Sequence, residues 1–340
     1  MTQQTAATTR EGFSLGAFWS RYGIFVVFIA VCVLFTFLAP WRDGRPIFLS
    51  QTNILNIIRQ VSIIGIMAVG MTYVITSREI DLGVGSLLGV CGMVAAVLQR
   101  AEAGLLLSIL APLLVGAGTG ALVGLLVTRG GVPSFVATLG VLAAYRGIAL
   151  LISGQPVLGI NPDFRIIGAG VLGDLPLFGA VPFLNTLPMP IVIFGVAIAV
   201  GAVAFWRYPF GRHVHAVGGN EQAARLSGIN VDRVKISVFM ISGVCAAISA
   251  LILTSRLNSG QPLAGTAYEL DVIAAVVVGG TSLAGGRGSV LGSVAGAMLI
   301  GVISNGLTLM AVSPHWQPVI QGTIIVGAVL FDQLGRRRES

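Results

Sequence analysis

Ten apolar runs, separated by polar segments, make up most of the chain. Each approaches the roughly 20 residues that a helix needs to cross the hydrocarbon core of a bilayer. The runs at 83–98 and 270–284 are short for a full crossing, so we expect them to be tilted, broken or partly re-entrant. The pattern predicts an all-α polytopic membrane protein with about ten transmembrane helices, near 22–39, 54–76, 83–98, 105–127, 135–152, 189–206, 234–253, 270–284, 290–310 and 319–334.

Polar segments at the ends and two longer connections set the organisation of the chain. We expect a cytoplasmic tail at 1–21, a single transmembrane domain at 22–334 and a second cytoplasmic tail at 335–340. The outer connection at 153–188 contains five prolines, which exclude a long helix. The connection at 207–233 is polar and basic, and we expect it to lie on the cytoplasmic side.

Composition and charge agree with this pattern. Hydrophobic residues make up 55% of the chain and charged residues only 10%, whereas a soluble domain carries roughly 25% charged residues. With the N-terminus in the cytoplasm, 13 of the 20 basic residues fall in cytoplasmic segments, which is the usual bias of membrane proteins. The basic excess therefore indicates cytoplasmic loops of a membrane protein rather than binding to nucleic acid.

An acidic pair occurs twice, as Glu79 and Asp81 after the second run and as Glu269 and Asp271 after the seventh. The two occurrences are five runs apart, so they are compatible with a 5+5 inverted repeat. Acidic residues at membrane depth are costly and often functional. They are interpreted here in three ways: as contacts to ligand hydroxyls, as a proton relay, or as structural caps paired with Arg78 or Arg59.

A short helix with both ends marked is predicted in the cytoplasmic connection. Asn220 is a good N-cap, and Glu221 places negative charge where the helix dipole favours it. Gly228 can adopt the left-handed conformation that ends a helix. The segment has the shape of a docking element, although an ordinary loop helix remains the alternative.

The same segment carries a resemblance to a known family. Ala223 and Ala224, followed at the usual spacing by Gly228, resemble the core of the cytoplasmic loop of ABC importer permeases, with Gln222 where Glu is usual. The wider string at 215–231, and the segments at 68–72, 80–86, 268–275 and 279–288, resemble ribose-type monosaccharide permeases. The resemblance implies a coupling helix that contacts an ATP-hydrolysing subunit through Asn220, Glu221, Gln222, Ala223, Ala224, Arg225, Leu226 and Gly228.

The chain itself is not expected to be an enzyme. A phosphate-binding loop requires a lysine in a glycine-rich setting, and the single lysine, Lys235, lies in a different context. No cofactor or metal site is expected in this chain, and the resemblance implies that ATP and Mg²⁺ bind to a cytoplasmic ABC ATPase subunit. It also implies a periplasmic sugar-binding protein and a second permease copy, identical or similar.

Polar residues in or near the apolar runs are candidates for the translocation pathway. Each is also a candidate for an ordinary hydrogen bond between helices. A rival function is a proton- or sodium-coupled secondary transporter that uses the acidic pairs. The candidates are Asn56, Gln60, Thr72, Tyr73, Glu79, Asp81, Thr138, Asn258, Glu269, Asp271 and Asn305.

Overall fold

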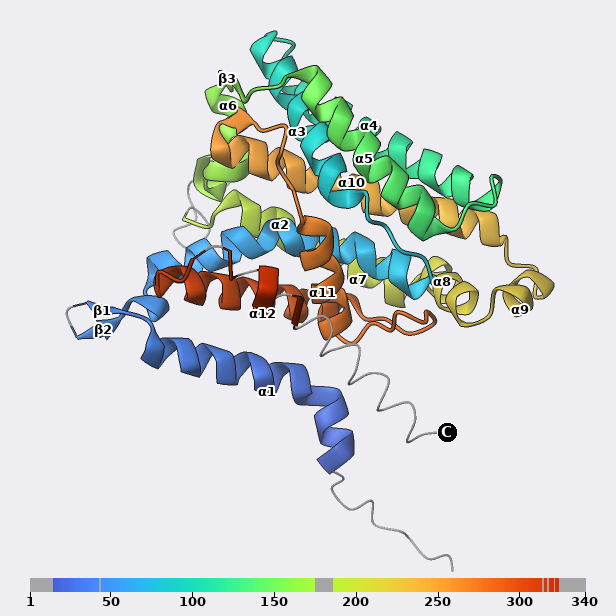
Figure 1. Cartoon of the computed structure of the whole chain (residues 1–340), viewed down its shortest axis with the longest axis horizontal. Helices are drawn as coiled ribbons and strands as arrows, with labels where there is room; N and C mark the ends of the chain where they lie inside the picture. Colours follow the sequence, from blue (N-terminus) through green and yellow to red (C-terminus); the bar gives the residue numbers. More distant parts are fainter. Residues whose placement is uncertain are drawn as a thin grey trace, which may run out of the picture.

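The computed structural model describes residues 15–42, 44–174, 186–313, 315–316, 318–320 and 322–323. These ranges fold into long helices joined by short connections (Figure 1). The long helices are α1 (Leu15–Leu38), α2 (Gln51–Thr76), α3 (Val84–Arg100), α4 (Leu105–Thr128), α5 (Ser134–Ile152), α7 (Met189–Trp206), α10 (Val231–Leu257) and α12 (Val290–Leu309).

Shorter elements lie at the ends of these helices or between them. Two small antiparallel pairs join β1 to β2 and β3 to β4, and the second pair connects the segment after α5 with the segment after α10. The short elements are β1 (Trp41–Arg42), β2 (Arg45–Pro46), β3 (Val157–Leu158), α6 (Pro162–Ala169), α8 (Pro209–Gly219), α9 (Glu221–Leu226), β4 (Ser259–Gly260) and α11 (Tyr268–Val278).

Helices α2 and α10 form the centre of the bundle. In each of them 67% of the most apolar stretch is buried, compared with 28% for α4 and 22% for α5. On the outer helices large apolar side chains remain exposed, such as Leu114 on α4 and Leu151 on α5. Exposed apolar surface of this extent is expected to contact lipid.

Close packing of α4 on α10 depends on glycines spaced four residues apart. Gly116, Gly120 and Gly124 face α10, where a Cβ atom on Gly120 would collide with the backbone of Phe239. Gly243 of α10 meets Gly116 in the same way. Small residues at this spacing let two membrane helices approach to backbone contact, which explains the high glycine content.

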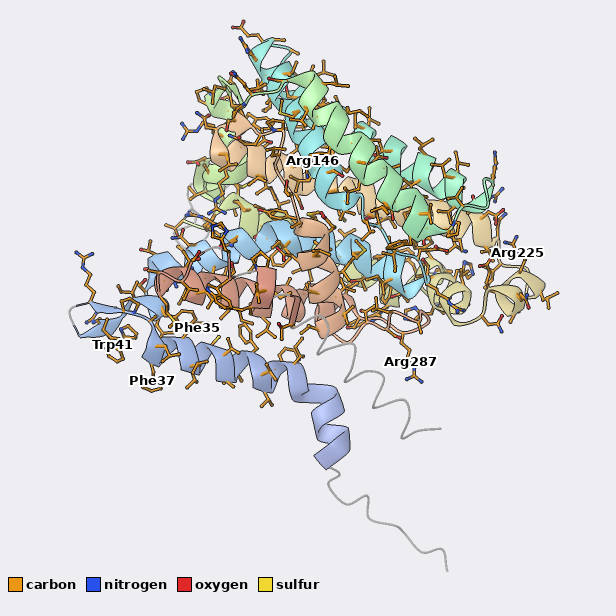
Figure 2. The ribbon with its side chains drawn as sticks, viewed as in Figure 1. Phe35, Phe37, Trp41, Arg146, Arg225 and Arg287 are labelled. Atoms are coloured by element: carbon orange, nitrogen blue, oxygen red, sulfur yellow. The ribbon has the colours of Figure 1, made fainter. Side chains whose placement is uncertain are left out.

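The bundle has two opposite ends, which we call the α9 end and the β1 end. The α9 end holds α8, α9 and the α11–α12 connection, and the β1 end holds β1, β2, β3 and α6 (Figure 1). Arg225 and Arg287 lie at the α9 end and Trp41 at the opposite end (Figure 2). In the predicted orientation the α9 end faces the cytoplasm.

Six of the predicted runs are confirmed as helices long and apolar enough to cross a membrane, namely α2, α4, α5, α7, α10 and α12. The chain is therefore a multi-pass membrane protein. Helix α3 and the 24–38 part of α1 are apolar but shorter. The run at 319–334 and both predicted tails lie mostly outside the described residues, so the count of ten, the domain boundaries and the cytoplasmic termini stay predictions.

The run at 270–284 is broken, as its shortness suggested. Helix α11 has 11 residues, a rise of about 17 Å, which is too short to cross a core of about 30 Å. The chain reaches α11 through a segment without regular structure that runs alongside α3. In this segment Pro262 lies against Gly89 of α3, and Gly265 lies against Gly85. Helix α11 therefore begins deep inside the bundle.

Helix α8 was not predicted, because the connection at 207–233 was interpreted only as a polar, basic loop. Its buried residues Gly211, Val214, Val217 and Gly218 repeat at helical spacing, so one face packs on the bundle and the other is polar. That spacing was a usable signal. The basic residues and histidines between these positions obscured it.

Replacing Gly218 by alanine is expected to destabilise the helical bundle at the α9 end. A Cβ atom there would collide with the carbonyl oxygen of Thr76, the last residue of α2. Overpacking of this kind typically costs about 1–3 kcal/mol. The thermal midpoint in detergent measures the effect, with Gly219→Ala as the matched control, because a Cβ atom on Gly219 meets nothing within 4 Å. Equal midpoints for the two variants would contradict this account.

Candidate functional site

Helix α9 is built as the sequence predicted. The side chain of Asn220 accepts a hydrogen bond from the Ala223 amide at 3.0 Å, which caps the first turn. Gly228 has φ of +81°, and the amides of Gly228 and Ile229 donate to the carbonyls of Arg225 and Ala224. A capped two-turn segment of this kind is held rigidly at both ends.

Most of α9 projects from the molecule. Ala224 is buried and fixes the helix to the bundle, whereas Glu221, Gln222, Ala223 and Arg225 are exposed. Leu226 is 90% exposed, more than any other large apolar side chain among the described residues. A leucine at the tip of a rigid polar helix has no role in the core of this chain, so it is suited to bind a partner.

A chain of ion pairs connects α9 with the interior. Arg225 contacts Glu221 at 3.3 Å and Asp232 at 3.0 Å. The ammonium of Lys235, on the first turn of α10, lies 2.8 Å from Glu221 and 2.7 Å from Glu79. Hydrogen bonding to Lys235, with a further contribution from Arg225, lowers the pKa of the Glu221 carboxyl. Glu221 therefore remains ionised at neutral pH, and the chain of charges stays intact.

The inner link of this chain is shielded from water. The side chain of Lys235 is 13% exposed and that of Glu79 is 8% exposed, whereas Glu221 and Arg225 are about half exposed. Exposed pairs contribute little to stability. Removing one partner of a buried pair costs about 3–5 kcal/mol, because the remaining charge is left without compensation. The contact between Lys235 and Glu79 is therefore the strong element.

The segment around Glu79 is fastened to two further helices. Asp81 accepts hydrogen bonds at 2.9 Å from the Gly83 amide and from the hydroxyl of Ser242 on α10. The backbone of Ile80 is bonded by Ser134 and Thr138 of α5. The connection between α2 and α3 is thus held by α10 and α5, with Lys235 of α10 paired to Glu79 in the same connection.

The predicted pairing of the acidic residues with Arg78 or Arg59 is wrong for Glu79, which pairs with Lys235. Arg78 adopts a left-handed backbone conformation with φ of 67° at the end of α2, and it is exposed. A left-handed residue in this position ends the helix. The predicted role of Asp81 as a cap is confirmed in part. Its carboxylate accepts a hydrogen bond from the amide of Gly83, the residue just before α3.

Comparisons with known proteins agree with this arrangement. Residues 53–329 match the family model described as "Branched-chain amino acid transport system / permease component". The chain is 40% identical to the ribose import permease protein of Haemophilus influenzae, over 96% of this chain and 98% of the relative. The chain belongs to this family of ABC transporter permeases. It is also 38% identical to the ribose import permease protein of Escherichia coli K12, covering 98% of the chain and 99% of that protein.

A relative with another sugar in its name is nearly as similar. The xylose transport system permease protein of Escherichia coli K12 is 37% identical, over 98% of the permease described here and 97% of the relative. The family membership is therefore shown over nearly the full length, while the relatives' names differ in the solute.

Several predicted pathway residues of the permease already bond within the protein. Thr72 donates to the carbonyl of Ala68 and to Ser293 of α12, and the hydroxyl of Tyr73 donates to the carbonyl of Gly201 on α7. Thr138 holds the Ile80 carbonyl, as described above. These contacts give all three hydroxyls a structural role between or within helices.

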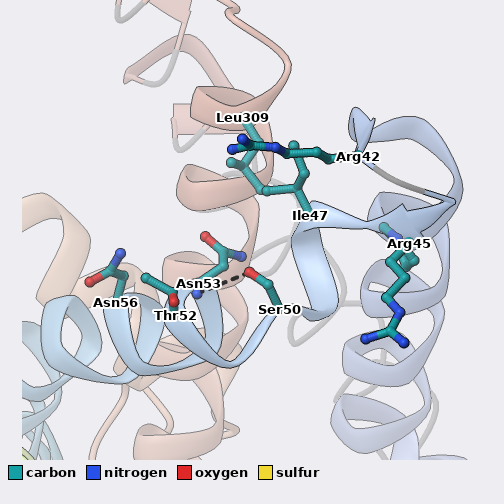
Figure 3. Close-up of a pocket in the computed structure, with 9 residues that line it drawn as sticks. Arg42, Arg45, Ile47, Ser50, Thr52, Asn53, Asn56 and Leu309 are labelled. Atoms are coloured by element: carbon teal, nitrogen blue, oxygen red, sulfur yellow. Dashed lines mark hydrogen bonds between the residues drawn. The ribbon is translucent and has the colours of Figure 1, made fainter.

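The end of α2 at the β1 end of the bundle carries a second group of the predicted residues. Asn305 of α12 exchanges two amide hydrogen bonds with Asn53, each 3.0 Å long. Asn56 lines a hollow of about 740 Å³ at the β1 end. Figure 3 shows Arg42 and Arg45 on its rim and Ser50 bonded to Asn53 within it.

The remaining candidates lie near the start of α11. Asn258 is exposed and ends α10 in a left-handed conformation. Glu269 lies against Gly85 at the start of α3. Gln60 and Asp271 line a common cavity of about 340 Å³ together with Arg256, Tyr268 and Ser304. The sequence did not point to Arg256, Tyr268, Ser304 or Lys235 as site residues, because their partners come from distant parts of the chain.

Proposed function

We propose that the chain is the membrane-spanning permease subunit of an ATP-driven importer for a monosaccharide or a related small polar solute. Two copies, identical or similar, form the pathway in a bacterial inner membrane, with the α9 end in the cytoplasm. The observation that carries the proposal is α9 itself, a rigid, projecting helix with an exposed Leu226 and a buried ionic connection to the α2–α3 segment.

In the proposed cycle, a cytoplasmic ATPase subunit holds α9 in a cleft. ATP binding closes the ATPase pair and moves α9, and Lys235 passes this movement to Glu79 and so to the connection between α2 and α3. The helices then open the pathway toward the outer face, where a periplasmic binding protein releases its solute. Hydrolysis returns the permease to the inward-facing state. The chain supplies a moving pathway and no bond-breaking chemistry.

ATP and Mg²⁺ belong to the partner in this proposal. The only lysine of the chain is engaged by Glu79 and Glu221 at 2.7 and 2.8 Å, so its charge is already compensated by two carboxylates. The segment at 282–287 that contains Gly285 and Gly286 is a tight turn closed by hydrogen bonds between Ser282 and Arg287 and between Gly285 and Ser282. That turn joins α11 to α12.

The solute class is proposed from the relatives and from polarity. Relatives named for ribose and xylose import are 37–40% identical over nearly the full chain. The acidic pair of Glu79 and Asp81 is held by Lys235, Ser242 and a backbone amide, which favours a structural role over a proton relay.

ATP dependence distinguishes this function from an ion-coupled transporter. In proteoliposomes that contain the permease, its ATPase subunit and its binding protein, uptake of labelled D-ribose or D-xylose is expected to require ATP. Uptake is expected to persist when a protonophore and a sodium ionophore remove the ion gradients. Uptake that follows an ion gradient without ATP would overturn the proposal.

A further inference from the structure

A cavity between the middle of the bundle and its β1 end combines polar groups from four helices. It has a volume of about 340 Å³, within the range of roughly 300–1,000 Å³ that is usual for small-molecule sites. Its walls come from α2, α10, α11 and α12, and its polar lining consists of Gln60, Arg256, Tyr268, Asp271 and Ser304.

The depth of the cavity is set by its position along the helices. Gln60 lies nine residues after the start of α2, roughly 14 Å from its outer end at 1.5 Å per residue. Asp271 is in the first turn of α11, which begins inside the bundle after a non-helical segment. Interrupted helices near the midplane are where transporters commonly place their solute sites.

Asp271 has an acceptor atom that nothing in the described structure satisfies. Its Oδ1 atom is buried and has no hydrogen-bond partner among the described residues. A buried polar atom without a partner typically costs about 1–3 kcal/mol. An atom of this kind at the wall of a cavity is an acceptor for a donor supplied by a ligand.

The other polar groups complement a neutral polyhydroxyl molecule. A carboxylate accepts hydrogen bonds, a guanidinium donates them, and a carboxamide does both, so hydroxyl groups of either role find a partner at Asp271, Arg256 or Gln60. The negative charge of Asp271 and the positive charge of Arg256 compensate each other. The ring of Tyr268 and the side chains of Ile64 and Leu253 provide apolar surface for the carbon skeleton.

We propose that this cavity is a sugar-binding station on the translocation pathway, in which Asp271 accepts hydroxyl donors from the solute and Gln60 and Arg256 fix its orientation. This inference rests on the proposed function and adds a solute site within the permease. The lining offers hydrogen-bond partners to the hydroxyl groups of uncharged pentoses and hexoses.

A cysteine reporter in the cavity tests the proposal in the assembled transporter. Ser304→Cys is combined with Cys32→Ser, since Cys32 is the one partly exposed native cysteine among the described residues, Cys91 and Cys245 being buried. D-Ribose or D-xylose, whichever the proteoliposomes take up, is expected to slow labelling by a small methanethiosulfonate reagent at least threefold. Arg129→Cys, exposed at the end of α4 and absent from the lining of both hollows, is the matched control and is expected to label at an unchanged rate. Leu257→Cys is a second reporter in the same cavity.

The variant Asp271→Ala decides the role of the carboxylate. In the Ser304→Cys background it is expected to remove the protection by the sugar. Absence of protection by a sugar that the same proteoliposomes import under ATP would overturn the site and leave the proposed function standing. Absence of any ATP-driven sugar uptake would instead overturn the proposed function. Protection that persists in Asp271→Ala would also contradict the assignment.

Discussion

The variant Lys235→Met is expected to lower sugar uptake by about tenfold or more while the assembled transporter continues to hydrolyse ATP. Methionine fills a similar volume but cannot bridge Glu221 on α9 to Glu79, which Lys235 contacts at 2.8 and 2.7 Å. Without this bridge a movement of α9 no longer reaches the connection between α2 and α3, so uptake falls while hydrolysis continues. The measurement is uptake and ATPase activity in the same proteoliposomes.

A double variant separates transmission from stability. Lys235→Met leaves the Glu79 carboxylate buried and unpaired, so its thermal midpoint is expected to fall. Combining Lys235→Met with Glu79→Gln removes that charge, so the thermal midpoint is expected to recover while uptake stays low. Lys235→Arg keeps the positive charge and is expected to retain both the wild-type midpoint and uptake. Recovery of uptake together with the midpoint in the double variant would mean that Lys235 serves stability alone.

Leu226→Asp is expected to abolish ATP-driven uptake without destabilising the permease. The side chain is 90% exposed, so the substitution removes almost no contact within the chain. In a partner cleft, burial of a leucine contributes about 1.5–3 kcal/mol, and a buried unpaired carboxylate opposes docking further. Uptake in proteoliposomes is expected to fall at least tenfold, and the thermal midpoint in detergent is expected to stay unchanged.

The matched control for that variant is the same substitution on the opposite side. Leu158 is 66% exposed and belongs to β3 at the β1 end. Leu158→Asp is expected to leave the association with the ATPase subunit intact. Wild-type uptake in Leu226→Asp, or equal loss of the ATPase subunit in both variants, would refute the assignment of α9.

The parts of the structure that sequence reasoning predicted are those encoded locally. The caps of α9 depend on Asn220 and Gly228, which lie within eight residues of each other, and their chemistry alone predicts a short helix. The apolar runs are equally local, because crossing a bilayer demands about 20 apolar residues in succession. The interruption before α11 was visible in the shortness of its run.

The parts that sequence reasoning missed depend on contacts between distant segments. Lys235 meets Glu221, 14 residues away, and also Glu79 in another connection, and no spacing rule selects that pair. Arg78 was an expected ion-pair partner of Glu79 because it is the adjacent residue. Instead, Arg78 adopts a left-handed backbone conformation that ends α2. Arg256, Tyr268 and Gln60 line one cavity only because three helices pack together. The cavity could therefore not be predicted from the sequence.

Co-purification tests the central claim that α9 is the docking element for an ATPase subunit. The permease is solubilised from native membranes in mild detergent, captured by a tag, and assayed for ATP hydrolysis, in parallel with Leu226→Asp and Leu158→Asp. The account predicts that an ATPase subunit elutes with the wild type and with Leu158→Asp, and is lost from Leu226→Asp. A permease that elutes without any ATPase, from membranes whose uptake follows the proton gradient, would contradict it.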